Sequence, residues 1–323
     1  MRKVNVYLII CCRFLNILSP EGDDLCRMIN MLIPLISILS MTTSPEPPTG
    51  LKILSWNIGM LPVVDIFVNS DERTKSIASV LDSGNYDIIV FQEAFTSRSR
   101  KILRKYLQDR YPYAYGPVNS SKLSFKVNSG LWILSKIPLE LKKEIEFTDS
   151  EGLDCLARKG AALFEGIFGY IRFHLVATHL QDDDYPQHIR EKQFAEIYEL
   201  LLSPFSEAGT PQIICGDLNT DEKNTEYYRD MLCRLDAEDG AISGNVKITF
   251  DDRSGDRFQS SHGNPRLIDY VLTRNSEFIQ WIDRKVAVLE SRWGKGEEYL
   301  SDHHGIEAVI KFKTSDYLST IYK

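Results

Sequence analysis

The sequence predicts an α/β protein (α+β) in which two packed, mostly antiparallel sheets are flanked by helices. Apolar runs of strand length are numerous, few segments between them have helical periodicity, and no internal repeat is present. Because many strands with few intervening helices do not fit a doubly wound parallel sheet, we expect two layered sheets with the helices outside. A hydrophobic content of 43% is sufficient for a core of that size.

The strands are predicted from short apolar runs, several of which stop at a glycine or a polar residue. In chain order they are residues 51–57, 87–91, 130–135, 161–164, 170–178, 212–215, 267–273 and 305–312. The first of them alternates along its length and ends in Asn57, whereas the second is continuously apolar and is followed by Glu93. The stretch that follows Gly216, up to about Asn264, is expected to be rich in loops.

Two helices are predicted between these strands. One begins with Ser70 as its N-cap, and the other begins at Pro186. Apolar residues at helical spacing predict their buried faces, namely Ile77, Val80 and Leu81 in the first helix and Ile189, Phe194, Ile197, Leu200 and Leu201 in the second.

Charge and cysteine content exclude some classes of function. The net charge is −7 and the pI is about 5.5, which argues against general nucleic-acid binding, because phosphate neutralisation requires a surplus of Lys and Arg. The sequence holds six cysteines but no CxxC pair, so a zinc site is not supported. Cys215 lies within an apolar strand and is expected to be a buried, small hydrophobic residue.

Residues 1–48 are expected to be a targeting segment with a Pro-rich linker at its end. The apolar runs 4–12 and 28–41 are shorter than a membrane-spanning helix requires, but each has the length of a signal-peptide hydrophobic region. We therefore expect secretion, with anchoring by this segment as the alternative. The folded domain is predicted at 49–313, followed by a tail at 314–323.

Polar residues of the types that catalyse reactions or bind ligands recur where the predicted strands end. They are Asn57, Glu93, His179, Asp217, Asn219, Asp269, Asp302 and His303. Ligand sites of layered α/β proteins gather at strand ends, so this recurrence predicts one shared site. Carboxylate and amide oxygens favour Mg²⁺, Mn²⁺ or Ca²⁺ over zinc. Two histidines beside such a site suggest hydrolysis with a general base and a charge-stabilising group.

Short motifs in a fixed order then give a specific resemblance. They are Trp56-Asn57-Ile58, Gln92-Glu93, Thr178-His179-Leu180-Gln181, Gly216-Asp217-Leu218-Asn219, Ile268-Asp269-Tyr270 and Ser301-Asp302-His303. They resemble the endonuclease/exonuclease/phosphatase superfamily over residues 51–312. Within it the chain is most similar to the neutral sphingomyelinases, bacterial sphingomyelinase C included, chiefly because Lys159-Gly160 precedes a strand. The resemblance implies a four-layer α/β sandwich with a metal-dependent phosphodiesterase or phosphatase site.

The resemblance also implies a role for each residue. The expected reaction is hydrolysis of sphingomyelin in membranes to ceramide and phosphocholine, with one or two Mg²⁺ ions, or Mn²⁺, as cofactor. Glu93 is the expected principal metal ligand with Asn57, and the remaining catalytic and metal-binding candidates are His179, Asp217, Asn219, Asp269, Asp302 and His303. Among these, His303 is the general base oriented by Asp269, and His179 stabilises charge on phosphorus. Lys159 and Asn219 are expected to contact phosphate, with an ordinary surface lysine as the alternative for Lys159.

Several features leave other functions open. Ser97 and Asn128 stand where the sphingomyelinases often have other residues, which could weaken accessory contacts. Trp293 is either a lipid contact or a residue packed in a turn. The alternatives are a metal-dependent nuclease or other phosphoesterase of the superfamily, and a catalytically inert binding module. The acidic balance argues against the nuclease, and the protein is expected to be a monomer.

Overall fold

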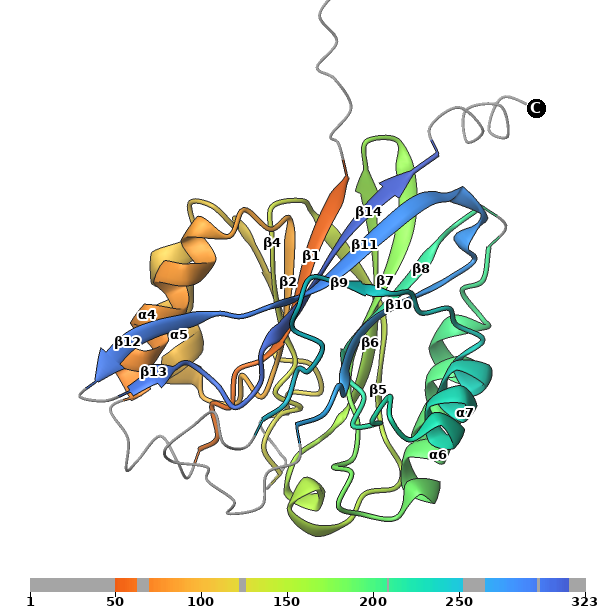
Figure 1. The fold of residues 1–323 in the computed structure, drawn as a ribbon, viewed down its shortest axis with the longest axis horizontal. Coiled ribbons are helices and arrows are strands. Elements are labelled where there is room, and N and C mark those ends of the chain that lie inside the picture. The colour runs from red at the N-terminus through yellow and green to blue at the C-terminus, as the bar shows by residue number, and fades with distance from the viewer. Residues whose placement is uncertain are drawn as a thin grey trace, which may run out of the picture. The chain divides into compact units, whose positions relative to one another are not determined.

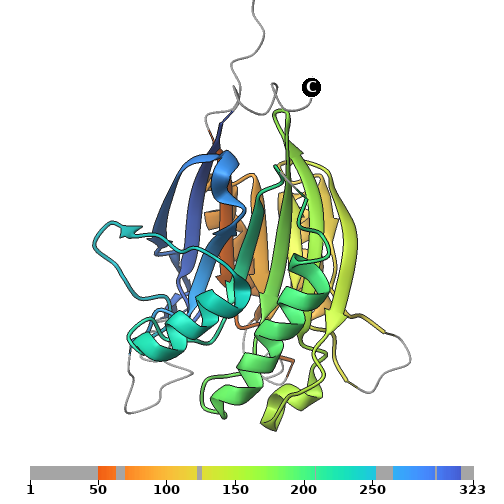
Figure 2. The ribbon, with the colours of Figure 1, turned by 90° about the vertical axis from the view of Figure 1, so that its right-hand side faces the viewer.

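Two large β-sheets form the centre of the structure, and helices cover their outer faces (Figures 1 and 2). This computed structural model describes residues 50–62, 70–121, 126–207, 209–251, 265–294 and 297–313. The arrangement is the predicted four-layer α/β sandwich, because each sheet has helices on one face and the other sheet on its opposite face. The predicted segment 1–48 and the tail 314–323 lie outside the described residues, so the domain boundaries stay predictions.

The larger sheet has seven strands. In spatial order they are β3 (Tyr113–Tyr115), β4 (Trp132–Ser135), β2 (Ile88–Gln92), β1 (Leu51–Asn57), β14 (Gly305–Phe312), β11 (Ile279–Ala287) and β9 (Ile242–Ser243). Strand β1 runs parallel to β2 and antiparallel to β14, so the end of β1 lies beside the end of β2 and the start of β14.

The second sheet has five strands. In spatial order they are β10 (Asp269–Arg274), β8 (Gln212–Asp217), β7 (Ile171–His179), β6 (Gly160–Phe168) and β5 (Leu139–Glu146). Strands β7 and β8 are parallel and the other neighbours are antiparallel, which confirms the expectation of mostly antiparallel sheets. A separate hairpin joins β12 (Glu290–Gly294) to β13 (Glu297–Tyr299).

Apolar side chains fill the three spaces between the four layers. Between the sheets, Val90 of β2 and Ile306 of β14 belong to the same buried cluster as Phe164 and Cys215 of the other sheet. Helices α4 (Ser70–Ser83) and α5 (Ser97–Leu107) cover the seven-stranded sheet. Helices α6 (Gln187–Ile197) and α7 (Thr225–Leu235) cover the five-stranded sheet (Figure 2). Short helical turns occur at Gly152–Leu156 and Ser276–Phe278.

The predicted strands are all present, but some elements were not expected. Helix α7 occupies part of the stretch that was expected to be loop-rich, and α5, β5 and β11 were not predicted at all. Leu200 is 40% exposed rather than buried, because a π-helical turn, Tyr198–Leu202, follows α6 and changes the side that each residue faces. In the described part of the chain, no helix is long and apolar enough to cross a membrane.

Candidate functional site

The polar residues predicted at strand ends gather around one cavity of about 240 Å³. Its lining includes Glu93, Lys159, His179, Asp217, Asn219, Asp302 and His303. The remaining two candidates do not line the cavity but contact residues that do: Asn57 donates a hydrogen bond to Asp217, and Asp269 is bonded to His303. The structure therefore brings together every residue that the sequence proposed for the site.

Strand pairing places three of these residues side by side. In the five-stranded sheet His179 is the register partner of Asp217, and Asp217 is also the partner of Asp269. Gly216 makes this close approach feasible, because a Cβ atom there would lie 2.1 Å from the carbonyl oxygen of Thr178. The glycine before Asp217 is thus required by the packing of β8 against β7.

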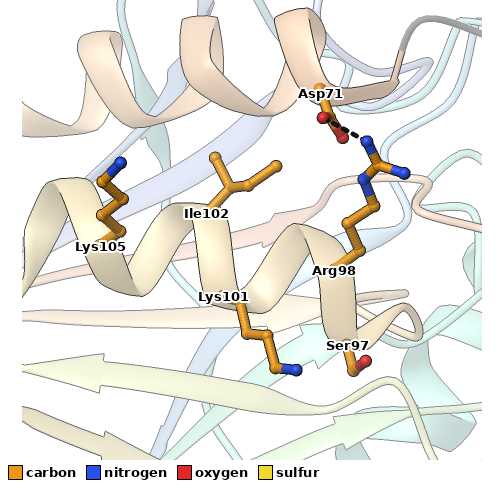
Figure 3. A pocket seen from close by; sticks show the side chains of 6 residues that line it. All are labelled: Asp71, Ser97, Arg98, Lys101, Ile102 and Lys105. Carbon is orange, nitrogen blue, oxygen red and sulfur yellow. Dashed lines mark hydrogen bonds and ion pairs between the residues drawn. The ribbon is translucent and has the colours of Figure 1, made fainter.

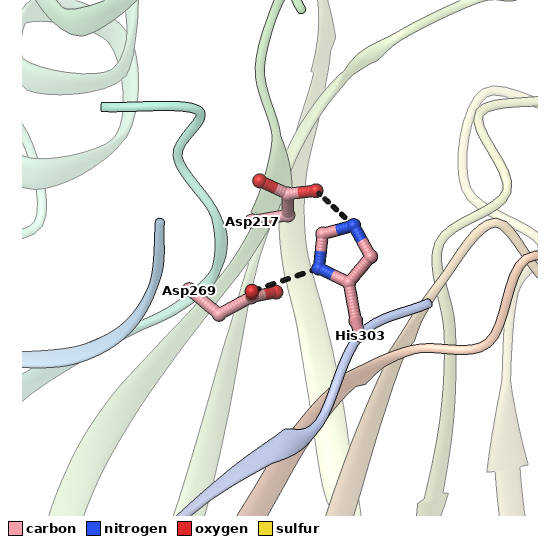
Figure 4. Close-up of side chains that lie close together, drawn as sticks. All are labelled: Asp217, Asp269 and His303. Carbon is pink, nitrogen blue, oxygen red and sulfur yellow. Dashed lines mark hydrogen bonds and ion pairs between the residues drawn. The ribbon is translucent and has the colours of Figure 1, made fainter. Parts of the chain in front are cut away.

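His303 lies between two carboxylates (Figure 4). Its Nδ1 is 2.9 Å from Oδ2 of Asp269, and its Nε2 is 3.7 Å from Oδ2 of Asp217. Burial lowers the pKa of His303, but the charges of Asp269 and Asp217 outweigh it, and the pKa lies well above its usual value. Burial and the neighbouring Asp269 raise the pKa of Asp217 to about 8. Asp269 thus fixes the imidazole ring and leaves Nε2 for proton exchange.

Lys159 is a buried residue of the site and not an ordinary surface lysine. It is 5% exposed, and its Nζ lies 2.8 Å from Oδ1 of Asp154, 2.9 Å from the Leu180 oxygen and 3.2 Å from Nε2 of His179. Because an ammonium group only donates hydrogen bonds, Nε2 of His179 accepts this one. The glycine that follows is also required, since a Cβ on Gly160 would lie 1.9 Å from the Ile145 oxygen.

His179 approaches the same carboxylate oxygen of Asp217 as His303 does. Its Nε2 is 3.6 Å from Oδ2 of Asp217, and its Nδ1 has no hydrogen-bond partner within the described residues. Burial, with the charges of Lys159 and His303, lowers the pKa of His179 well below its usual value. The imidazole is therefore neutral, and Lys159 supplies the positive charge on this side of the cavity.

Glu93 and Asn57 form an oxygen-rich corner at the ends of β2 and β1. Glu93 has φ +54°, a left-handed conformation that is uncommon for glutamate, and Asn219 has φ +49°. Burial and the charge of Asp302 raise the pKa of Glu93. Two carboxylates and an amide oxygen in one partly buried corner fit a hard divalent cation.

The two loops that carry this corner are fixed to each other. Trp56 Nε1 donates to the His303 oxygen at 2.9 Å, and Ser301 Oγ donates to the Asn57 oxygen at 2.8 Å. Arg73 of α4 is buried and donates from Nη1 to the oxygens of Ile58, at 3.1 Å, and Leu300, at 2.9 Å. These hydrogen bonds therefore hold the end of β1 and the segment before β14 together.

Sequence reasoning missed the cavity wall next to His303. The Phe250 ring lies 4.9 Å from the His303 ring, and the Arg266 guanidinium lies 4.8 Å from the centre of the Phe250 ring. Arg266 also forms an ion pair with Asp183. Phe250 falls in the stretch that was expected to be loop-rich. It reaches the cavity through backbone pairing with Arg266 and with His303, and a sequence pattern does not contain such pairing.

Both positions at which the chain departs from the sphingomyelinase pattern lie outside the cavity lining. Ser97 is the exposed first residue of α5. Asn128 Nδ2 donates to the Phe95 oxygen at 3.2 Å, and Asn128 Oδ1 accepts from the Gly130 nitrogen at 2.9 Å. Asn128 thus stabilises the turn next to the Glu93 loop.

The chain is similar to several known proteins in sequence and in structure. The chain is 31% identical over 290 residues to Sphingomyelinase C 2 of Leptospira interrogans, which covers 80% of this chain and 46% of that protein. It spans about half the length of this and a second sphingomyelinase C of Leptospira interrogans. A beta toxin of Staphylococcus aureus superimposes with a TM-score of 0.71 at 25% identity, covering 81% of this chain and all of that one. A mutant of that toxin, described with bound magnesium ions, gives 0.72 at 24% identity with the same coverage. Residues 54–303, from β1 to His303, match the endonuclease/exonuclease/phosphatase family, and the chain belongs to that family.

Proposed function

We propose that the protein is a metal-dependent phosphodiesterase that hydrolyses sphingomyelin to ceramide and phosphocholine. The observation that carries the proposal is that two histidines contact the same carboxylate, Asp217: His303, held by Asp269, and His179, bonded to Lys159. The names of the relatives in Leptospira, sphingomyelinase C, support the choice of substrate.

The residues of this chain divide the work of hydrolysis. The deprotonated form of His303 accepts at Nε2 the proton of the water that attacks phosphorus, and Asp269 stabilises the imidazolium that forms. The Lys159 ammonium, held by His179 and Asp154, attracts the phosphoryl oxygens as their charge grows. The Asn219 amide donates to the Leu180 oxygen at 3.2 Å, and we expect it to contact the phosphoryl group as well.

A divalent cation completes the proposed site. Glu93 and Asn57 would hold it, with Asp302 beside them and with Asp217 and Asn219 available to a second ion. Asp217, Asp269 and His303 also offer ligand atoms within 4.8 Å of one another, and Nδ1 of His303 is bonded to Oδ2 of Asp269. When bound, such an ion neutralises the charge on the departing alkoxide. The magnesium ions described for the related toxin support a divalent cation, and we propose Mg²⁺, with Mn²⁺ as the alternative.

Activity should be lost in EDTA and restored by Mg²⁺, because the proposed ligands are oxygen atoms that bind hard cations. The measurement is release of phosphocholine from sphingomyelin, compared with phosphatidylcholine and plasmid DNA as substrates. Full activity in the chelator would disprove the metal requirement. Cleavage of DNA with no cleavage of sphingomyelin would leave the family membership intact and replace the proposed substrate.

Trp293→Ala should weaken binding to sphingomyelin vesicles by about tenfold while turnover of a soluble substrate persists. Trp293 is half-buried in the β12–β13 hairpin, its Nε1 donates to the Tyr299 oxygen at 2.8 Å, and Tyr299 itself is exposed. We propose that the hairpin contacts lipid and that Trp293 shapes it. Trp281→Ala is the matched control, since Trp281 is exposed on β11; equal losses in both variants would remove the hairpin from the interface.

We also propose that the protein is secreted and acts as a monomer, with anchoring through residues 1–48 as the alternative. Mass spectrometry of the N-terminus of the protein recovered from its native host's medium or membranes distinguishes these two cases.

A further inference from the structure

A shallow groove of about 350 Å³ lies between α4 and α5, apart from the candidate site. Asp71, Ser97, Arg98, Lys101, Ile102 and Lys105 line it, and none of them lines the cavity at the strand ends. Figure 3 shows Arg98 and Lys105 extending toward α4 with Ile102 between them, while Lys101 extends to the other side of α5. The groove is therefore a cationic surface with an apolar floor.

The positive charge on α5 exceeds what the fold uses. The helix sequence contains five basic residues and no acidic one, in a chain whose net charge is −7. Three of them have structural partners: Arg98 Nη2 donates to Oδ2 of Asp71 at 2.6 Å, Arg100 Nη1 donates to the Phe95 oxygen at 2.8 Å, and Arg104 Nη2 donates to the Pro112 oxygen at 2.7 Å. The other two, Lys101 and Lys105, line the groove together with Arg98.

These three charges are unfavourable for the isolated fold. Arg98 lies in the first turn of α5, where the helix dipole disfavours cations, and Lys101 and Lys105 are like charges at i and i+4. Asp71 compensates Arg98 through an ion pair of 2.6 Å. Within the described residues, Lys101 and Lys105 form no ion pair with a carboxylate, and the Lys105 ammonium lies 5.9 Å from the centre of the Tyr106 ring. An external anion would remove this repulsion.

We propose that the α4–α5 groove docks the protein on a membrane surface that carries anionic phospholipids. Tyr106 follows Lys105 and is 53% exposed, and tyrosine beside lysine is typical of residues at a membrane interface. Strand β12 of the hairpin packs against α4, so the groove and the hairpin belong to one side of the molecule (Figure 1). This second point depends on the proposed lipid function, whereas the charge argument does not.

The test is co-sedimentation with phosphatidylcholine vesicles prepared with and without phosphatidylglycerol. The vesicles contain no sphingomyelin and the buffer contains EDTA, so that hydrolysis does not enter the readout. The wild-type protein should bind only the anionic vesicles, and added salt should weaken the binding. Lys101→Glu/Lys105→Glu should lower the partition coefficient by about tenfold or more, since each basic residue near an anionic surface contributes.

The matched control is Lys143→Glu/Lys311→Glu, which changes the net charge equally at exposed positions on β5 and β14. The proposal is overturned if the wild-type protein does not prefer anionic vesicles, or if the control loses as much binding as the groove variant. Loss of oligonucleotide binding in the groove variant, without loss of vesicle binding, would also overturn it. Sphingomyelin hydrolysis without anionic binding removes only this proposal, and anionic binding without hydrolysis removes only the proposed activity.

Discussion

Replacement of His303 by alanine is expected to lower turnover by about 10²–10⁴-fold, the range for a lost general base. The structure supports this expectation, because Asp269 holds Nδ1 at 2.9 Å and leaves Nε2 as the nitrogen that exchanges a proton. His179→Ala should cause a loss of similar size, since it removes the acceptor that holds the Lys159 ammonium in the cavity. Phosphocholine release at saturating substrate is the measurement.

The controls separate chemistry from folding. His188 is exposed on α6, so His188→Ala should retain wild-type turnover. Because removal of His303 leaves the buried carboxylates of Asp217 and Asp269 without their partner, His303→Gln provides a second variant of closer size. The thermal unfolding midpoint is recorded for each. Near-wild-type turnover in a folded His303 variant would show that another group is the base.

Glu93→Gln is expected to raise the Mg²⁺ concentration for half-maximal activity by about 10–100-fold. Removal of a residue that only orients a metal ligand lowers metal affinity by that amount, and removal of a ligand itself should lower it at least as much. The substitution keeps the size of the side chain and removes its charge. Direct calorimetric titration of the protein with Mg²⁺, without substrate, should show the same loss of affinity. That readout does not depend on turnover.

Glu226→Gln, at an exposed position on α7, is the matched control and should bind Mg²⁺ as the wild type does. Unchanged Mg²⁺ affinity in Glu93→Gln, with reduced turnover, would move the metal away from this corner. The nearest other carboxylates are then the group around Asp217, and Asp217→Asn would be the next variant.

The site was predictable from the sequence because its residues lie at the ends or the starts of the apolar runs that define strands. Asp217 after residues 212–215 and His179 after 170–178 were placed correctly, since parallel strands end at the same edge of a sheet. The resemblance given by the ordered motifs then supplied the expected role of each of these residues. The strands were recognised for the same reason, because their buried residues are consecutive.

Other parts of the molecule carry no comparable pattern. Helix α5 buries only Ser99, Leu103 and Leu107, and apart from Ile102 and Tyr106 the rest of its sequence is polar, so its apolar period is too sparse to recognise. Helix α7 buries Met231 and Leu235 alone. The position of Arg266 over the Phe250 ring depends on the path of a loop, and no local periodicity encodes such a path.

The hydrogen bond of 3.1 Å from Asn57 to Asp217 joins strands of different sheets. Glu93 and His303 also come from the seven-stranded sheet and its loops, whereas Lys159, His179, Asn219 and Asp269 come from the five-stranded one. The proposed site residues are therefore divided between the two sheets, and a change in the twist of either sheet would shift one set of residues relative to the other.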